Sequence, residues 1–174
     1  MDIDQAKLRV DNVLLYTLSN ANVYSGDHGY TFSKFLDETS ANNFEISAAE
    51  RESLRNYLET QLQSNSERFE THVNLVKGYC KLKSAVLDVG CGGGAFLTLC
   101  RRDGFECFGI EPDLNRAQYA EQQTQAKIFN QDIASEEFIE ENHEKFDCVT
   151  FWDVIEHVNF PSASLKAAAR CLKK

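Results

Sequence analysis

Residues 86–96 read V-L-D-V-G-C-G-G-G-A-F, an apolar strand followed by a glycine-rich turn and the start of a helix. Glycines let a backbone turn sharply and approach a ligand with no Cβ atom in the way, and a helix start offers free N–H groups. Asp88 stands two residues before Gly90, so we expect its carboxylate to lie close to anything that binds at the turn. The stretch therefore predicts a strand, a ligand-binding loop and a helix, in this order.

On the C-terminal side of this stretch, short apolar segments alternate with helical ones, which is typical of βαβ units and a parallel sheet. Strands are predicted at Ala85–Val89, Cys107–Ile110, Lys127–Asn130 and Cys148–Phe151. Helices are predicted near Ala95–Arg102, Leu114–Gln123, Ser135–Glu141 and Ser162–Leu172. The pattern indicates an α/β fold with a doubly wound parallel sheet, and we expect this sheet to be incomplete at its C-terminal end.

The N-terminal third is predicted to be a mostly helical extension, residues 1–66, ahead of the α/β domain, residues 67–174. Apolar residues recur at helical spacing from Ile3 to Leu18. A capping box at 47–50 predicts the start of a second helix, and the break at 64–66 separates that helix from a third.

Composition and charge exclude several classes of protein. With 43% hydrophobic residues the chain can build a real core, and with a formal net charge of -9 it offers no basic footprint for nucleic acid. No apolar run reaches the roughly 18 residues of a membrane span, and the N-terminus does not resemble a signal peptide. Six scattered cysteines without a C-x-x-C pair suggest a reducing compartment and neither zinc nor disulfides. We expect a cytoplasmic protein that binds no membrane and no nucleic acid.

Two nucleoside cofactors fit the glycine-rich turn. Gly90-x-Gly92-x-x-Ala95 matches the dinucleotide fingerprint, which is weak evidence by itself. Asp88 would repel a pyrophosphate, whereas a ligand with an ammonium and a sulfonium group and no phosphate would be attracted to it. Glu111, 21 positions beyond Gly90, is placed to accept hydrogen bonds from the ribose hydroxyls of either cofactor. The residues favour S-adenosylmethionine over a nicotinamide dinucleotide.

Three motifs, in this order, resemble those of the class I S-adenosylmethionine-dependent methyltransferases. They are V-L-D-V-G-C-G-G-G-A-F-L, then G-I-E-P-D at 109–113, and F-D-C-V-T-F-W-D-V-I-E-H-V at 146–158. The resemblance covers about residue 69 to the end and implies a Rossmann-like sheet of seven strands, of which strands five to seven are not expected here. It also implies methyl transfer to a small-molecule, glycan, lipid or natural-product acceptor.

The expected cofactor contacts lie at the ends of the four predicted strands. They are Asp88, Gly90, Cys91, Gly92, Glu111, Pro112, Asp132, Ile133, Phe151 and Trp152. Asp132 is expected to accept a hydrogen bond from the exocyclic amine of adenine, and the apolar Ile133 beside it is expected to contact the face of the base. The resemblance implies that Phe151 and Trp152 lie near the methionine part and the transferred methyl group.

Methyl transfer is an in-line displacement, in which positioning and desolvation can do most of the work. For a hydroxyl acceptor, His157 is the candidate general base, and the alternative is a histidine that orients its loop. Asp153, Glu156 and His157 also resemble the E-x-x-E-H metal ligands of some O-methyltransferases, but Asp replaces the first Glu here. Since many small-molecule members share E-H-V without a metal, we predict no metal site.

Two alternative functions remain open from the sequence. A nicotinamide-dependent oxidoreductase is opposed by Asp88 and by the absence of a Tyr-x-x-x-Lys pattern. A domain that lacks its last strands could also bind the cofactor and catalyse nothing. We expect the irregular stretch with Tyr24, Tyr30 and Phe32 to cover the cofactor crevice, and the sequence leaves open whether the chain forms a homo-oligomer.

Overall fold

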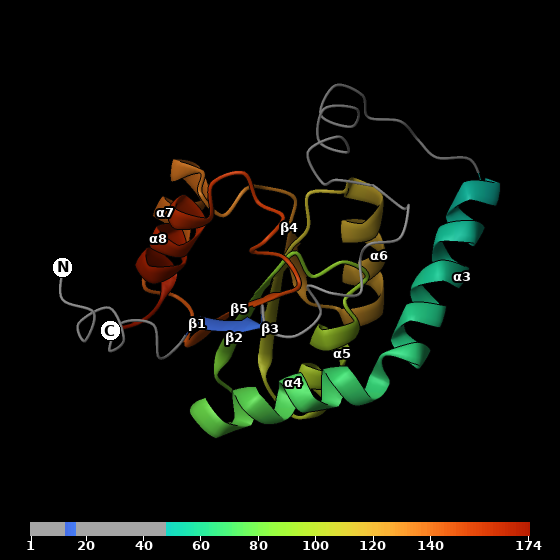
Figure 1. Cartoon of the computed structure of the whole chain (residues 1–174), viewed down its shortest axis with the longest axis horizontal. Helices are drawn as coiled ribbons and strands as arrows, with labels where there is room; N and C mark the ends of the chain where they lie inside the picture. The colour runs from blue at the N-terminus through green and yellow to red at the C-terminus, as the bar shows by residue number, and fades with distance from the viewer. Residues whose placement is uncertain (1–12, 17–47) are drawn as a thin grey trace.

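The computed structural model describes residues 13–16 and 48–174 of the chain (Figure 1). The strands are β1 (Val13–Tyr16), β2 (Ala85–Val89), β3 (Glu106–Ile110), β4 (Lys127–Phe129) and β5 (Cys148–Trp152). The helices are α3 (Ala48–Ser64), α4 (Ser66–Tyr79), α5 (Ala95–Arg102), α6 (Leu114–Thr124), α7 (Glu136–Glu141) and α8 (Pro161–Cys171). The strands and helices predicted from residue 85 onward are confirmed, with bounds that differ by one or two residues at most.

The five strands in the described part of the chain are all parallel, in the order β1-β5-β2-β3-β4 (Figure 1). The chain moves outward from β2 through β3 to β4 and then returns to place β5 on the other side of β2. In such sheets, ligands bind beyond the carboxyl ends of the strands at the point where the strand order reverses. The loops after β2 and β5 therefore lie where a ligand is expected.

Side chains of the central strands alternate between two cores, because successive residues of a strand point to opposite faces. Leu87 and Phe151 belong to a core formed with α7 and α8, whereas Val86 and Trp152 belong to a core formed with α4, α5 and α6. Figure 1 shows α7 and α8 on one side of the sheet and α4, α5 and α6 on the other. Every residue of β2 and β5 is buried, as expected for a parallel sheet that is covered on both faces.

Helix starts are fixed by local chemistry. Asp113 caps α6, since its carboxylate accepts a hydrogen bond from the backbone N–H of Arg116 at the start of that helix. Ser135 caps α7 in the same way, and Pro161 occupies the first turn of α8, where no backbone donor is needed. These caps explain why the predicted helix starts agree with the structure.

One predicted element is wrong. The helix expected from Ile3 to Leu18 is contradicted over Val13–Tyr16, which form strand β1 paired with β5 from Val149 to Trp152. A short apolar run fits a buried strand as well as a helix, and pairing with the open edge of β5 decides between them here. The rest of that expected helix, and the stretch expected to cover the crevice, lie outside the described residues.

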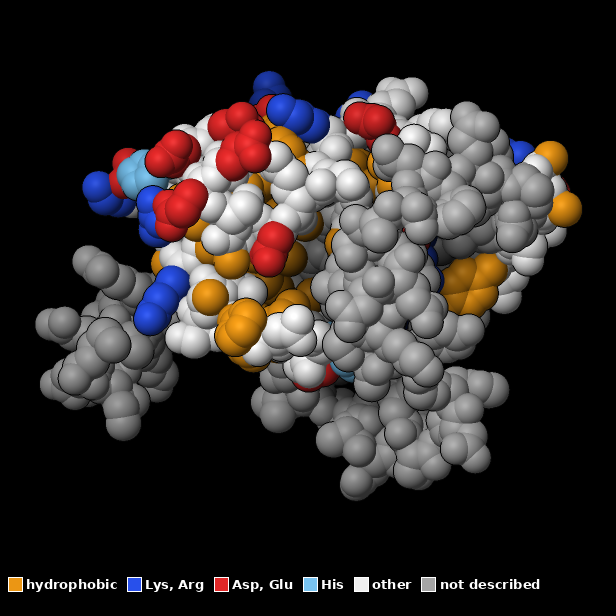
Figure 2. Space-filling view, turned by 90° about the horizontal axis from the view of Figure 1, so that it is seen from above, with side chains coloured by type: hydrophobic (Ala, Val, Ile, Leu, Met, Phe, Trp, Pro, Cys, Tyr) orange, Lys and Arg blue, Asp and Glu red, His pale blue; other side chains and the backbone are white. Residues whose placement is uncertain are grey.

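The acidic run at residues 136–144, which includes α7, lies on the surface. The glutamates of α7 are exposed, and Figure 2 shows acidic side chains gathered over the end of the molecule where α7 and α8 lie. Lysine and arginine side chains stand beside them. Among the described helices, none combines the length and apolar character needed to cross a membrane.

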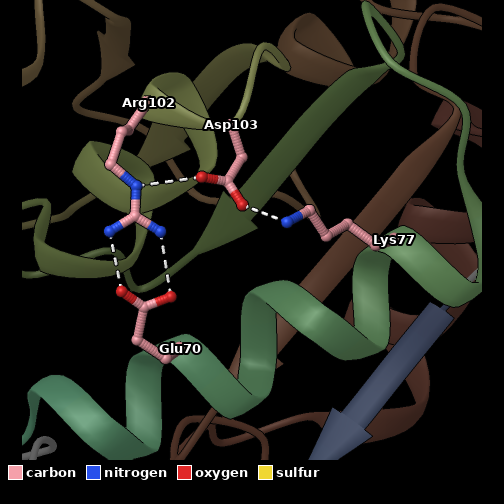
Figure 3. A network of polar contacts seen from close by, with 4 residues as sticks. All are labelled: Glu70, Lys77, Arg102 and Asp103. Carbon is pink, nitrogen blue, oxygen red and sulfur yellow. Dashed lines mark hydrogen bonds and ion pairs between the residues drawn. The ribbon is translucent and has the colours of Figure 1, made fainter.

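Four charged side chains join α4 to the end of α5 (Figure 3). The Arg102 guanidinium donates two hydrogen bonds to the Glu70 carboxylate, at 2.7 and 2.9 Å, and a third to Asp103 at 2.9 Å. Lys77 forms an ion pair with the other oxygen of Asp103. These contacts fix α4 across the sheet, on the face that also carries the glycine-rich loop.

We expect Asp103→Asn to lower the melting temperature by a few degrees, because Asp103 holds two cations at once. Lys77, and next Arg102, lower the pKa of Asp103 below its ordinary value of 3.8. The stabilisation is therefore present at neutral pH and is lost as the pH falls through the lowered pKa. Thermal unfolding at low and at high salt tests this prediction. An effect that does not shrink at high salt contradicts it, because salt screens such exposed pairs.

Candidate functional site

A cavity of about 420 Å³ lies at the carboxyl ends of β2 and β5. The loop after β2, the end of β5, and residues of α3, α4, α5 and α6 form its walls. Five of the predicted cofactor contacts line it, namely Asp88, Gly90, Cys91, Gly92 and Trp152. The cavity therefore lies where the strand order predicts a ligand.

Asp88 supplies a buried carboxyl group to this cavity. Its side chain is 3% exposed, and Oδ1 accepts a hydrogen bond of 2.6 Å from the Thr150 hydroxyl. Thr150 is paired with Asp88 in the register of β2 and β5, so both side chains point to the same face of the sheet. Burial raises the pKa of Asp88 to about 8, and the Thr150 hydrogen bond opposes part of this rise. A cation in the cavity would be attracted to the ionised form.

The glycine-rich loop has the conformation that its sequence requires. Gly90 and Gly92 have φ angles of +73° and +56°, in the left-handed region that favours glycine. A Cβ atom at Gly90 would come within 2.5 Å of Val154 Cγ2, whereas a Cβ at Gly92 would meet nothing within 4 Å. Gly90 is therefore required by packing, and Gly92 leaves open space at the cavity wall.

Glu111, at the end of β3, is tied to the same loop. It is buried, and its two carboxylate oxygens accept hydrogen bonds from the backbone N–H groups of Gly92 at 2.8 Å and Asp113 at 3.0 Å. Burial raises the pKa of Glu111, and the hydrogen bond from Asp113 opposes the rise. Each carboxylate oxygen can accept more than one hydrogen bond, so both can still take a ligand hydroxyl.

The other predicted contacts lie away from the walls of this cavity. Pro112 is held at the turn after β3, where its carbonyl accepts a hydrogen bond of 2.7 Å from Asn130. Asp132 is exposed and accepts from the backbone N–H of Ala134, while Ile133 is buried in the core beside α7 and α8. Phe151 is fully buried in that same core, on the face of the sheet opposite Trp152.

Arg68 of α4 is a cavity residue that the sequence analysis missed. Its Nη1 donates a hydrogen bond of 2.7 Å to Oδ2 of Asp153, the residue that follows β5. Its Nε atom is buried and has no hydrogen-bond partner among the described residues. Asp153 itself has a φ of +54°, a strained value for a residue other than glycine. The pair places a guanidinium group and a carboxylate at the wall next to Trp152.

The candidate base and the candidate metal ligands do not gather in this structure. His157 is exposed and is not among the residues that line the cavity, and its backbone N–H donates to the carbonyl of Val154. The Asp153 carboxylate is engaged by Arg68. Within 13–16 and 48–174, no cluster of three histidine, cysteine or acidic side chains could hold a metal ion.

Comparison with known families decides the class of protein. Residues 51–174 match the family described as the methyltransferase domain, which is most of the chain. This chain belongs to the methyltransferase-domain family. The match begins within α3 and takes in the glycine-rich loop, the cavity and the whole of the sheet except β1. The resemblance noted from the three motifs is thereby confirmed.

Curated relatives match a little more than half of this chain. The ubiquinone biosynthesis O-methyltransferase of Acinetobacter baylyi is 39% identical over 92 residues, which are 51% of this chain and 39% of that protein. The protein of the same name from Hydrogenovibrio crunogenus is 30% identical over 105 residues, 58% of this chain and 44% of that protein. The chain thus spans less than half the length of these two relatives.

Solved structures share the fold of the methyltransferase domain. The PH0226 protein from Pyrococcus horikoshii has a TM-score of 0.56 and 28% identity, covering 64% of this chain and 54% of its own. A Thermotoga maritima protein, described as a SAM-dependent methyltransferase and possible histamine N-methyltransferase, has a TM-score of 0.55 and 22% identity, covering 68% and 53%. These likenesses agree with the doubly wound parallel sheet expected from the sequence.

Proposed function

We propose that this chain binds S-adenosylmethionine and transfers its methyl group to a small-molecule acceptor. The observation that carries the proposal is the buried Asp88 carboxyl group, which lines the cavity beside a glycine-rich loop. A cationic, phosphate-free nucleoside is attracted to such a group, and a diphosphate is repelled. The name shared by the curated relatives favours an oxygen atom as the methyl acceptor.

The described residues fit the parts of this cofactor. Asp88, at the cavity wall, offers a carboxylate to its ammonium and sulfonium groups. Glu111 is not among the residues that line the cavity, but it is bound to the loop at Gly92, and we propose that its remaining acceptor capacity serves the ribose hydroxyls. Arg68, whose Nε atom has no hydrogen-bond partner among the described residues, is a donor for the cofactor carboxylate. Because Gly92 has no side chain, the space beside it is open to the ligand. We propose that Asp132 and Ile133 contact the adenine from the end of β4 and that Cys91 and Pro112 complete the surroundings. Phe151, by contrast, is fully buried in the core on the opposite face of the sheet, so its side chain supports the end of β5 from behind.

When bound, the cofactor supplies an electrophilic methyl group on a sulfonium. The protein positions the acceptor atom in line with that methyl group. The apolar walls formed by Trp152 and Phe96 exclude water from the reacting groups. A hydroxyl acceptor must also lose its proton, and we propose His157, in the turn after β5, as the base that takes it. Since His157 is exposed, this role requires the acceptor to approach from the β5 end of the crevice.

Isothermal titration tests the proposal. We expect S-adenosylhomocysteine to bind in the micromolar range, worth about 8 kcal/mol, and NAD to give no heat of binding. NAD binding without a response to S-adenosylhomocysteine would instead support an oxidoreductase, to which the glycine spacing also conforms. Binding of S-adenosylhomocysteine without methyl transfer to any supplied hydroxyl acceptor would leave a domain that only binds the cofactor.

We also propose the surroundings in which this function operates. All six cysteines are free and five of them are buried, which fits a reducing compartment such as the cytoplasm. We propose that residues 67–174 form the cofactor-binding domain and that residues 1–66 form an N-terminal extension, which contributes β1 to the sheet of that domain. Tyr57 and Glu59 of α3 line the cavity, so we propose that the extension takes part in acceptor selection.

A further inference from the structure

Two rings from distant parts of the chain lie face to face beside the cavity. The centroids of the His72 imidazole, on α4, and the Trp152 indole, at the end of β5, are 3.9 Å apart, and the ring planes are 5° from parallel. Phe96 meets both rings edge-on, at 6.4 and 5.4 Å. Stacked and edge-on contacts are preferred by aromatic rings, so this packing fixes the plane of the indole.

His72 affects the cavity indirectly. Trp152 and Phe96 line the cavity, but His72 does not. His72 is only 1% exposed and lies behind these two rings, in contact with both of them. We infer that His72 is a positioning residue, which holds the Trp152 ring in place as a wall of the cofactor cavity. The effect of His72 on cofactor binding rests on the proposed function, whereas its effect on the Trp152 ring does not.

The charge state of His72 suits this role. Burial, together with the nearby Arg68 guanidinium, lowers the pKa of His72 to about 4, and the Asp153 carboxylate opposes the shift. The imidazole is therefore uncharged at neutral pH and can stack on the indole without the cost of a buried charge. The Arg68 and Asp153 ion pair lies at the cavity wall next to this uncharged stack.

The position of His72 is set by the anchoring of its helix. Glu70 and Lys77 lie on either side of it along α4, and both are bound to the end of α5 by Arg102 and Asp103 (Figure 3). Val76, one turn after His72, is fully buried in the same core as Trp152. The helix is thus fixed at both sides of the stacked ring, so the indole rests against a rigid partner.

Fluorescence of Trp152 gives a direct test, because Trp152 is the only tryptophan in the chain. His72→Leu keeps buried apolar volume but removes the flat ring, and His72→Phe restores a flat ring. We expect His72→Leu to speed the local depolarisation of Trp152 in the ligand-free protein and to weaken S-adenosylhomocysteine binding about fivefold. We expect His72→Phe to retain slow depolarisation and an affinity within about twofold of the unchanged protein.

Val76→Ala is the matched control, since it removes buried volume from the same helix and core but leaves the His72, Phe96 and Trp152 rings in place. We expect it to lower the melting temperature and to leave Trp152 depolarisation unchanged. If His72→Leu does not fold, His72→Met, which also lacks a ring, takes its place. The inference is wrong if the ringless variant leaves depolarisation unchanged, or if His72→Phe or Val76→Ala loosens the indole as much. Failure of the unchanged protein to bind S-adenosylhomocysteine overturns the proposed function alone.

Discussion

Asp88→Asn is expected to weaken S-adenosylmethionine binding by about 2 kcal/mol or more, a factor of at least about thirty. The substitution keeps the size of the side chain and removes the only charge that this buried position can offer the cationic ligand. In the unchanged protein the pKa of Asp88 is about 8, so ligand binding must release its proton at neutral pH. Affinity should therefore rise by about tenfold per pH unit below pH 8 and then level off.

Isothermal titration from pH 6 to pH 9 measures both effects. The Asp88→Asn variant should bind S-adenosylmethionine weakly, and its affinity should not change with pH in this way. Glu106→Gln removes an equal charge from the exposed start of β3 and should bind as the unchanged protein does. Equal affinity for Asp88→Asn, or a slope that persists in it, would contradict the assigned role of Asp88.

The same substitution should stabilise the fold at high pH. Because the pKa of Asp88 is raised above its ordinary value of 3.8, the folded protein binds a proton that the unfolded chain releases. Stability contributed by this group is complete below about pH 4 and is lost as the pH rises toward 8. We therefore expect Asp88→Asn to raise the free energy of unfolding by about 2 kcal/mol at pH 8, and by less at pH 5. Equal effects at the two pH values would argue against a protonated Asp88.

Gly90→Ala is expected to lower the free energy of unfolding by about 3 kcal/mol. The added Cβ would clash with Val154 at 2.5 Å, and the φ of +73° adds the strain of a left-handed residue with a side chain. Urea unfolding measures the loss as a lower midpoint with an unchanged slope.

Two other glycines provide graded controls for this substitution. At Gly92 the added Cβ meets open space, so only the backbone strain remains and Gly92→Ala should cost about 1 kcal/mol. Gly78 lies within α4 with no atom near its added Cβ, and Gly78→Ala should stabilise the protein by up to about 1 kcal/mol. The packing argument fails if Gly90→Ala costs no more than Gly92→Ala.

Much of the fold could be predicted because its signals are local. The run from Val86 to Phe96 carries its own strand, turn and helix start, and Asp113 carries the cap of the next helix. The same locality predicts that Asp88 and Trp152 each lie near the carboxyl end of a strand, and both line the cavity. Sequence neighbours decide these features, so no long-range information is needed.

The missed features depend on contacts between distant segments. Thr150 reaches Asp88 only through the register of β2 and β5, which a single sequence does not reveal. Arg68 reaches Asp153 because α4 crosses the sheet near the end of β5. The sequence around Arg68 contains no motif that predicts this contact. Phe151 and Trp152 are predicted as a pair, but strand geometry sends the two side chains to opposite faces.

Pairing of β1 with β5 joins distant parts of the described chain, since Val13 is aligned with Val149. During synthesis on the ribosome, the residues of β1 emerge first but cannot pair until β5 has been made and placed beside β2. Until then the outer edge of β5 offers unpaired backbone groups to any other strand in the cell. The nascent protein therefore depends on β1, made before β5, to cover this edge, and aggregation competes with that pairing.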